Sequence, residues 1–252
     1  MKRRDLIKTG LGTSIALGAS ASMPARVFAQ PMAGSARDRE LFAIAKRELD
    51  KAGDVIWRKD IVGIADFGLH SAERRFHFVN LDRQEVKSFH VSHGSGSDPE
   101  HDGWLNGYSN LTNSWATSRG AYITWEWYEG RYGTSVRLGG LDADNSNAYP
   151  RAIVMHAANY ATPDHVARWG RLGRSNGCFA FGPEVFPQAL TRLMGGRLLF
   201  AASLGIGPAG EQVQAPPQEQ PDFEAIAAEN NRREAEARAA REAELDVEVS
   251  PE

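Results

Sequence analysis

The residues with the clearest chemical potential are one cysteine and one histidine. Cys178 is the only cysteine of the 252-residue chain and directly follows the polar turn 174–177, while His156 comes earlier, near the end of the apolar run 151–158. A thiolate is a strong nucleophile, but a free thiol with a pKa of about 8.5 needs a neighbouring base to react at neutral pH. His156 would supply that base, and Gly177 would let backbone N–H groups approach a substrate oxyanion. Taken singly, a lone cysteine and a strand-end histidine are also common in an ordinary core, so the residues around them must decide between a chemical and a structural role.

The N-terminal segment changes the meaning of the cysteine. Residues 1–29 combine a basic start with the adjacent Arg3 and Arg4, a modest apolar run over 11–21 and a small-residue exit before Gln30. This pattern is typical of an export signal and resembles a twin-arginine signal. We therefore expect a bacterial protein exported in folded form to the periplasm or cell envelope, with an uncleaved anchor as the alternative to cleavage. An exported chain with one cysteine cannot form an internal disulfide, which favours Cys178 as a reactive thiol.

Composition excludes some classes of partner. A formal net charge of −3 gives no reason to expect nucleic-acid binding. No segment after the signal is apolar enough to span a bilayer, so we expect no membrane span once the signal is removed. The seven histidines show no metal-ligand spacing, and we expect neither a metal nor another cofactor. The oligomeric state is left open.

The elements that must position Cys178 and His156 are mostly strands. An amphipathic helix over 38–53 places four apolar residues on one face, namely Leu41, Ile44, Ala45 and Leu49. Short runs rich in β-branched and aromatic residues predict strands at 60–67, 75–81, 85–94, 120–128, 134–140 and 151–158, with a hairpin between the second and third. A helix over 182–196 and a closing strand over 197–203 complete a mainly β domain at 41–205, preceded by a linker at 30–40.

A second change of composition begins at residue 206. A Pro, Gln and Gly linker is followed by 221–252, which holds ten Asp or Glu against four Arg. A helix from Asp222 to about Leu245 is compatible with this composition, but its apolar face is limited to Phe223, Ile226 and Ala227. The segment 206–252 is therefore predicted to be a linker and an acidic, largely disordered or helical tail that does not dock on the domain, with a partner-binding helix as the alternative.

The residues around the pair resemble a known family. The segment "IVMHAANY" followed by "GRSNGCFAF" resembles the catalytic signature of the L,D-transpeptidases, in which a histidine strand precedes a Ser-x-Gly-Cys segment. The stretches "FHVSHGSGSD", "NGYSNLTNSWATSRGAY" and "SVRLGGLDADNSNAYPRAIVMH" are similar to the murein L,D-transpeptidase catalytic-domain branch. The resemblance covers roughly residues 55–203 and implies an L,D-transpeptidase-like β-sandwich or barrel with a few short helices.

The resemblance also implies acyl transfer on peptidoglycan stem peptides. Cys178 would attack the carbonyl of the third stem residue and His156 would be the base. The other expected site residues have supporting roles: Ala157 orients the imidazole through its carbonyl, Asn176 and Gly177 hold the oxyanion, and Arg174 and Ser175 bind substrate. The alternatives to a transpeptidase are an L,D-carboxypeptidase or endopeptidase with the same residues, and a non-catalytic cell-wall binding module.

The sequence departs from the family pattern on both sides of the cysteine. Asn176 stands where many members have His, and Phe179 and Ala180 stand where many have an apolar residue followed by Asn or Arg. The second departure removes an anchor for a substrate carboxylate. Arg174 is the nearest substitute, unless it pairs with an acid on the rim. His93 is the competing candidate for the base.

Overall fold

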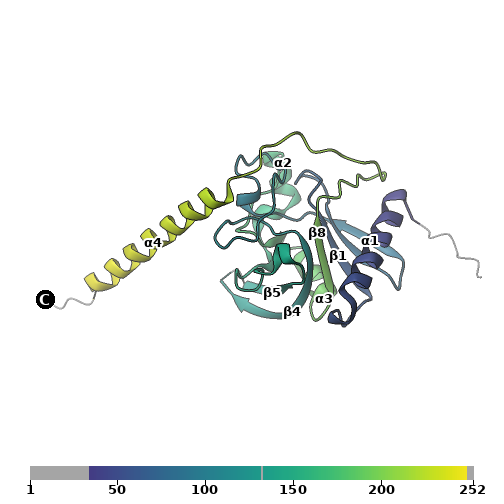
Figure 1. Cartoon of the computed structure of the whole chain (residues 1–252), viewed down its shortest axis with the longest axis horizontal. Coiled ribbons are helices and arrows are strands. Elements are labelled where there is room, and N and C mark those ends of the chain that lie inside the picture. The colour runs from purple at the N-terminus through teal and green to yellow at the C-terminus, as the bar shows by residue number, and fades with distance from the viewer. Residues whose placement is uncertain (1–33, 132, 249–252) are drawn as a thin grey trace, which may run out of the picture. The chain divides into compact units, whose positions relative to one another are not determined.

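One continuous sheet forms the body of the protein. The computed structural model describes residues 34–131 and 133–248, so the expected signal 1–29 and the first residues of the expected linker lie outside it (Figure 1). Within the described residues, eight strands pair in the order β3-β2-β1-β8-β4-β5-β6-β7. They are β1 Ile61–Asp66, β2 Phe76–Asn80, β3 Glu85–Phe89, β4 Gly120–Gly130, β5 Gly133–Gly140, β6 Val154–Ala157, β7 Phe179–Phe181 and β8 Leu198–Ala202. The pairs β1–β8 and β6–β7 are parallel, and the others are antiparallel.

The sheet curls until its two edges meet. Ser92, just after the edge strand β3, bridges Ala180 of the opposite edge strand β7, and its N–H donates to the Ala180 carbonyl at 2.9 Å. Aromatic rings fill the interior, with Phe76 and Phe181 packed edge to face at a centroid distance of 4.8 Å. The predicted mainly β fold of the sandwich or barrel type is confirmed.

Two helices cover the sheet from opposite sides. The helix α1 (Ala36–Ala52) buries the four predicted residues Leu41, Ile44, Ala45 and Leu49 in a core with β1 and β8. It begins inside the stretch 30–40 expected to be a linker, because Ser35 caps it by accepting a hydrogen bond from the Asp38 N–H at 3.1 Å. The helix α3 (Phe186–Leu193) packs into the aromatic interior through Phe186, Ala189 and Leu193.

Two short elements were not predicted from the sequence. The helix α2 (Pro163–Trp169) is capped by the Thr162 hydroxyl, which accepts from the His165 N–H, and has Pro163 in its first turn. The strand β7 has only three residues, and its hydrogen bonds come from β6 and from Ser92. Both elements flank the stretch that contains Cys178.

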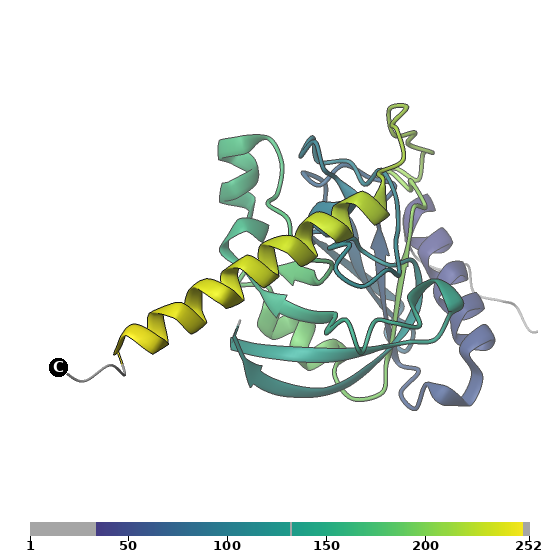
Figure 2. The same ribbon diagram turned by 60° about the vertical axis from the view of Figure 1, so that its left-hand side comes forward.

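The acidic tail forms the helix α4 (Phe223–Glu248), and its first turns contact the domain (Figure 2). Ala227 and Asn230 are 5% and 3% exposed, and the Asn230 side chain donates to the Asn113 carbonyl at 2.8 Å. This docking differs from the expected solvated tail. The reason is that the contact uses a small residue and an amide rather than a broad apolar face, so a hydrophobic pattern does not reveal it.

Candidate active site

The strands β6 and β7 place Cys178 and His156 on one face of the sheet. Their parallel register pairs Met155 with Phe179 and His156 with Ala180. Neighbours in a parallel pair share a face, and successive residues alternate between faces. Met155 and Phe179 enter the aromatic core. Extending the alternation by one residue puts Cys178 on the other face, diagonal to His156.

The turn before Cys178 depends on glycine. Gly177 has a φ of +105°, and a Cβ there would lie 2.7 Å from the Ala116 carbonyl oxygen and 2.9 Å from Ile153 Cδ1. A side chain is therefore excluded both by backbone conformation and by space. This lets the turn lie directly against the 114–117 loop.

Ser175 shapes the same turn. Its side chain is buried, its hydroxyl donates to the Cys178 carbonyl at 2.7 Å, and it accepts from the Gly177 N–H at 3.2 Å. Two expectations change as a result. Ser175 lies under the turn rather than facing a substrate, and the Gly177 N–H, expected to help hold an oxyanion, already has an acceptor in this state.

A second segment holds the turn from behind. The Ser175 N–H donates to the His93 carbonyl at 2.9 Å, and the Ser95 N–H donates to the Ser175 carbonyl at 2.8 Å. The His93 ring lies between the Arg75 guanidinium at 2.7 Å and the Asp98 carboxylate at 3.1 Å. Burial, with the charge of Arg75, lowers the pKa of His93 to about 4. His93 is thus a neutral, fully buried bridge, and this geometry does not favour it as the base.

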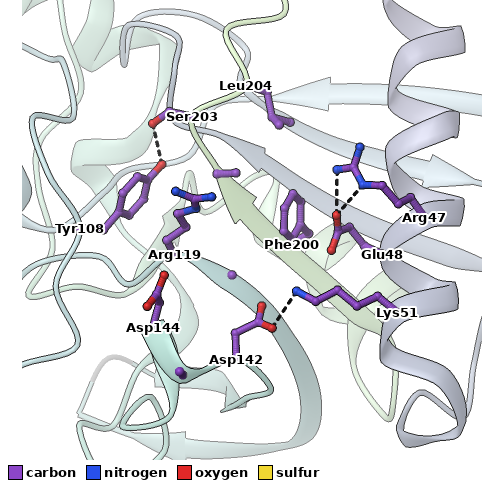
Figure 3. A pocket seen from close by; sticks show the side chains of 13 residues that line it. Arg47, Glu48, Lys51, Tyr108, Arg119, Asp142, Asp144, Phe200, Ser203 and Leu204 are labelled. Carbon is purple, nitrogen blue, oxygen red and sulfur yellow. Dashed lines mark hydrogen bonds and ion pairs between the residues drawn. The ribbon is translucent and has the colours of Figure 1, made fainter.

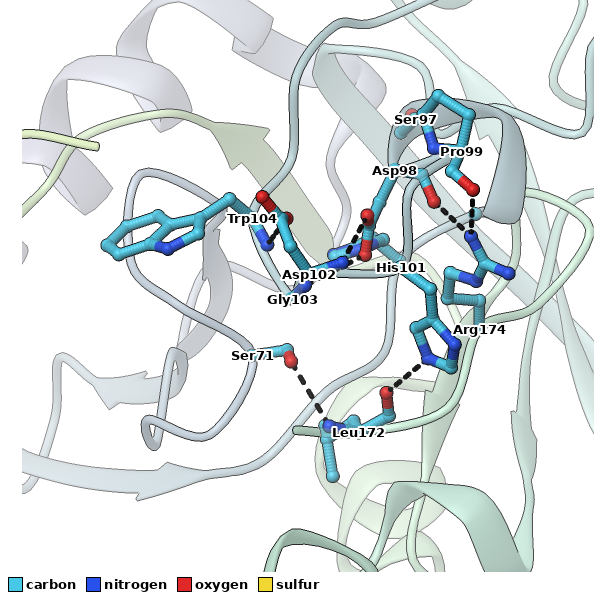
Figure 4. A network of polar contacts seen from close by, with 12 residues as sticks. Ser71, Ser97, Asp98, Pro99, His101, Asp102, Gly103, Trp104, Leu172 and Arg174 are labelled. Atoms are coloured by element: carbon cyan, nitrogen blue, oxygen red, sulfur yellow. Dashed lines mark hydrogen bonds and ion pairs between the residues drawn. The ribbon is translucent and has the colours of Figure 1, made fainter. Parts of the chain in front are cut away.

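Arg174 lies beside the loop that contains Asp98 and Pro99 (Figure 4). Its guanidinium donates to the backbone carbonyl of Asp98 and, at 3.2 Å, to that of Pro99. The sequence left two roles open for Arg174, as an anchor for a substrate carboxylate or as the partner of an acid on the rim. The contacts observed for Arg174 are to backbone carbonyls. Arg174 also lines a cavity of about 550 Å³ together with Trp115 and the first turns of α4.

The imidazole of His156 is oriented by the backbone. His156 Nδ1 lies 3.0 Å from the Ala157 carbonyl oxygen, and His156 is 3% exposed. Because a carbonyl only accepts hydrogen bonds, this contact places the proton on Nδ1 and makes Nε2 the proton-accepting nitrogen. Burial lowers the pKa of His156, which keeps the ring neutral at neutral pH.

The thiol opens into a cavity of about 260 Å³. The cavity is lined by Thr112, Asn113, Trp115, Pro150, Arg151, Ala152, Asn176, Cys178 and Glu234. Five described residues other than glycine have a positive φ, and three of them, Asn113 at 60°, Trp115 at 50° and Ala152 at 53°, belong to this lining. Such conformations cost about 1–3 kcal/mol each and cluster at functional sites. Their concentration around Cys178 marks this cavity as the candidate active site.

Burial keeps the resting thiol protonated. Cys178 is 9% exposed, and its Sγ donates to the Ala152 carbonyl at 3.7 Å. Burial raises the pKa of the thiol from 9.0 to about 11, against the opposing effects of a Val154 backbone hydrogen bond and the Arg151 charge. With the thiol and the imidazole both neutral, attack by the thiol would require transfer of its proton to a base.

A larger cavity of about 600 Å³ lies between α1, β4 and β8 (Figure 3). Its charged side chains are largely paired with one another: Arg47 contacts Glu48 at 2.8 Å, and Lys51 contacts Asp142 at 2.9 Å. Tyr108 donates to or accepts from Ser203 at 2.8 Å. None of its lining residues is a cysteine or a histidine, so it is not the thiol site.

Among the described residues, no group of three or more His, Cys, Asp or Glu residues is arranged to hold a metal ion. No helix in the described ranges is both long enough and apolar enough to cross a bilayer.

These observations define the architecture. It is a closed, mainly β domain with a buried thiol at the start of an edge strand. The model of the L,D-transpeptidase catalytic domain matches residues 35–202, which is most of the described chain. The chain therefore belongs to the L,D-transpeptidase catalytic-domain family.

The individual proteins to which the chain is similar share little sequence identity with it. An L,D-transpeptidase from Mycobacterium smegmatis is 15% identical, with a TM-score of 0.36, over 57% of this chain and 58% of that one. L,D-transpeptidase 3 from Mycobacterium tuberculosis, solved with a faropenem-derived adduct, is 14% identical, with a TM-score of 0.34, over 56% and 60%. The helical cell shape determining protein Pgp2 from Campylobacter jejuni is 12% identical, with a TM-score of 0.38, over 77% and 61%. The matches thus cover about three fifths of each of these relatives. No curated protein matches the sequence.

Proposed function

We propose that this protein is an exported, cysteine-dependent L,D-transpeptidase that acts on peptidoglycan stem peptides. Family membership supports the peptidoglycan substrate and the type of reaction. The single observation that supports the catalytic assignment is the cavity around Cys178, which brings the thiol to a strained wall on the face of the sheet that carries His156.

The first half of the reaction forms a thioester. His156 Nε2 takes the thiol proton as the Cys178 sulfur attacks the carbonyl carbon of the third stem residue. The bond from that carbon to the nitrogen of the terminal D-amino acid then breaks, and the leaving nitrogen takes the proton from the imidazolium. The Ala157 carbonyl keeps Nδ1 protonated throughout.

The second half passes the acyl group to an amine. His156 removes a proton from the acceptor amine as the amine nitrogen attacks the thioester carbon. The bond from that carbon to the Cys178 sulfur then breaks, and the departing thiolate takes the proton from the imidazolium. Asn176 is exposed and lines the cavity, so its amide is available to the oxyanion of either step. Arg174 is the proposed contact for a substrate carboxylate.

The organisation along the chain follows from this proposal. Residues 1–29 would be the twin-arginine-like signal, 41–205 the catalytic domain and 206–252 the linker and tail, with delivery to the periplasm or cell envelope. Fractionation of cells that produce the chain, compared with an Arg3→Lys, Arg4→Lys variant, tests the export route. Retention of the wild-type chain in the cytoplasm would contradict it.

Defined muropeptides test the reaction itself. Purified protein is incubated with tetrapeptide muropeptides and a D-amino acid, and the products are analysed by mass spectrometry. We expect cross-linked dimers or exchanged D-amino acids, both lost in Cys178→Ala and Cys178→Ser variants that keep the wild-type circular dichroism. Tripeptides alone would instead identify a carboxypeptidase, and unchanged substrate would favour a binding module.

A further inference from the structure

Arg151 is a charged residue that the proposed reaction does not use. It lies three residues before β6 and lines the same cavity as Cys178. Its guanidinium is half-buried and makes four hydrogen bonds, all to one loop. Nη1 donates to the Ser109 carbonyl at 2.9 Å and to Ser118 Oγ at 2.7 Å, and Nη2 donates to the Ala116 carbonyl at 2.7 Å and to Ser114 Oγ at 3.3 Å.

All four acceptors are neutral, as they also are for the buried Arg75, which donates to the Val91 and Leu69 carbonyls and lies 2.7 Å from the neutral His93 ring. Arg197, also buried, is paired with the Asp60 carboxylate at 2.9 and 2.7 Å. In the described part of the chain, Arg151 forms no ion pair with a carboxylate. A buried charge without a counter-ion is costly, so its position beside a nucleophile needs a reason.

The loop that Arg151 holds is the strained wall of the cavity. The segment 109–118 contains Asn113 and Trp115, both with a positive φ, and its Ala116 carbonyl lies against the turn at Gly177. No strand or helix lies in this segment. Hydrogen bonds within it, such as Ser109 N–H to the Thr117 carbonyl at 3.0 Å and the Ser114 hydroxyl to the Leu111 carbonyl at 2.8 Å, shape it in part, and contacts from outside add to them. The four hydrogen bonds from Arg151 are such contacts.

Two other titratable groups belong to the candidate site. Glu234 of α4 lines the cavity at its exposed side, where Asn113 Nδ2 donates to it at 3.2 Å, whereas His156 of β6 is neutral and is not among the lining residues. Among the residues that line the cavity, Arg151 is the one cation.

We propose that Arg151 is a positioning residue of this site, whose guanidinium fixes the 109–118 loop as a wall of the cavity and whose charge stabilises the thiolate that forms at Cys178. The role rests on the proposed function, because it acts through the Cys178 nucleophile. Opposite charges at close range favour the ionised form of an acid, which is the direction in which Arg151 acts on the thiol.

Two variants separate the charge from the hydrogen bonds. Arg151→Met keeps the length of the side chain and removes both, whereas Arg151→Lys keeps the charge but cannot reach four acceptors. The rate of Cys178 alkylation by iodoacetamide is measured from pH 7 to pH 10, beside muropeptide kcat and KM. Arg137→Gln is the matched control, because Arg137 contacts Glu126 and stacks on Tyr128 without lining the cavity.

We expect Arg151→Met to alkylate about tenfold more slowly at each pH, as for a thiol pKa raised by about one unit. Arg151→Lys should keep the alkylation rate within about threefold of wild type and lose activity mainly through a higher KM. Thermal melting shows whether each variant is folded, and Arg151→Lys carries the test if Arg151→Met does not fold. Wild-type alkylation and wild-type kcat and KM in both arginine variants would overturn the proposal. Wild-type protein that alkylates normally but leaves muropeptides unchanged would instead contradict the proposed function.

Discussion

The protonation state of Cys178 gives a quantitative prediction about the native protein. Burial raises the pKa of the thiol from 9.0 to about 11, a difference of two units. Each unit is a tenfold change in the thiolate population and about 1.4 kcal/mol. At pH 8 the native thiol should therefore hold about a hundredfold less thiolate than an exposed cysteine, and forming it costs about 3 kcal/mol more.

Alkylation with iodoacetamide measures this difference. The reaction is followed by intact mass from pH 7 to pH 10.5, with the native protein beside the protein unfolded in guanidinium chloride. In the native protein the rate should still rise tenfold per pH unit at pH 10, whereas in the unfolded protein it should level off near pH 9. Restricted access to the thiol would lower the rate at which the alkylation profile levels off. The pH at which the profile bends reports the pKa of the thiol.

The same shift predicts the pH dependence of stability. Between pH 9 and pH 11 the folded state holds the Cys178 proton and the unfolded state has lost it, so folding stability falls as the pH rises through this window. Below pH 9 both states are protonated and this contribution is constant. Cys178→Ser, which does not titrate there, should remove this part of the decline in urea unfolding. A bend at or below pH 9 in the native alkylation profile would refute the reasoning, because the thiol would then be at least as acidic as in the unfolded protein.

Three further predictions concern other parts of the site. His156→Ala should lower muropeptide kcat/KM by about 10²–10⁴, the usual range for a lost general base. The control His70→Ala, whose ring Nε2 lies 2.8 Å from the Asp102 carbonyl oxygen, should leave it within about threefold, and equal losses would remove His156 from its role. A carbapenem should add one intact molecule to the protein by opening its lactam ring on the Cys178 sulfur, and mass spectrometry should find no adduct in Cys178→Ser; an adduct on another residue would contradict the assignment. A chain ending at Pro221 should melt a few degrees lower in calorimetry, since Ala227 and Asn230 are the only buried side chains among those described in α4. An unchanged melting temperature would mean that the helix does not stay docked in solution.

Local patterns in the sequence predicted the strands that hold the candidate site. The run 151–158 contains β6 and the run 120–128 lies within β4, because long apolar or alternating segments carry their own signal. The three residues of β7 carry too little pattern to be recognised, and their pairing comes from β6 and Ser92. The helix α2 could have been found from Thr162 and Pro163, which are a capping residue followed by a first-turn proline.

The residues around the thiol were harder to predict than the thiol itself. Cys178 stood out because it is the only cysteine. Arg151 carries no local signal, since its four acceptors lie more than thirty positions away along the chain. Ser175 was expected to contact substrate, but only the folded turn shows that its hydroxyl is used by Cys178 and Gly177. Contacts between segments far apart in the sequence decide such roles, and the hydrophobic periodicity of a single segment does not reveal them.

The order of the strands has a consequence for how the protein is made. The last strand along the chain, β8, lies between β1 and β4, and it is the only strand that pairs with both. During synthesis, the hairpin side with β1–β3 and the side with β4–β7 therefore lack the strand that joins them until residue 202 has been added. Cys178 and His156 belong to one side, and the segment at His93 that holds the turn before Cys178 belongs to the other. A growing chain thus carries its thiol for some time before these two sides can join, and the surroundings of Cys178 are complete only when the whole domain folds.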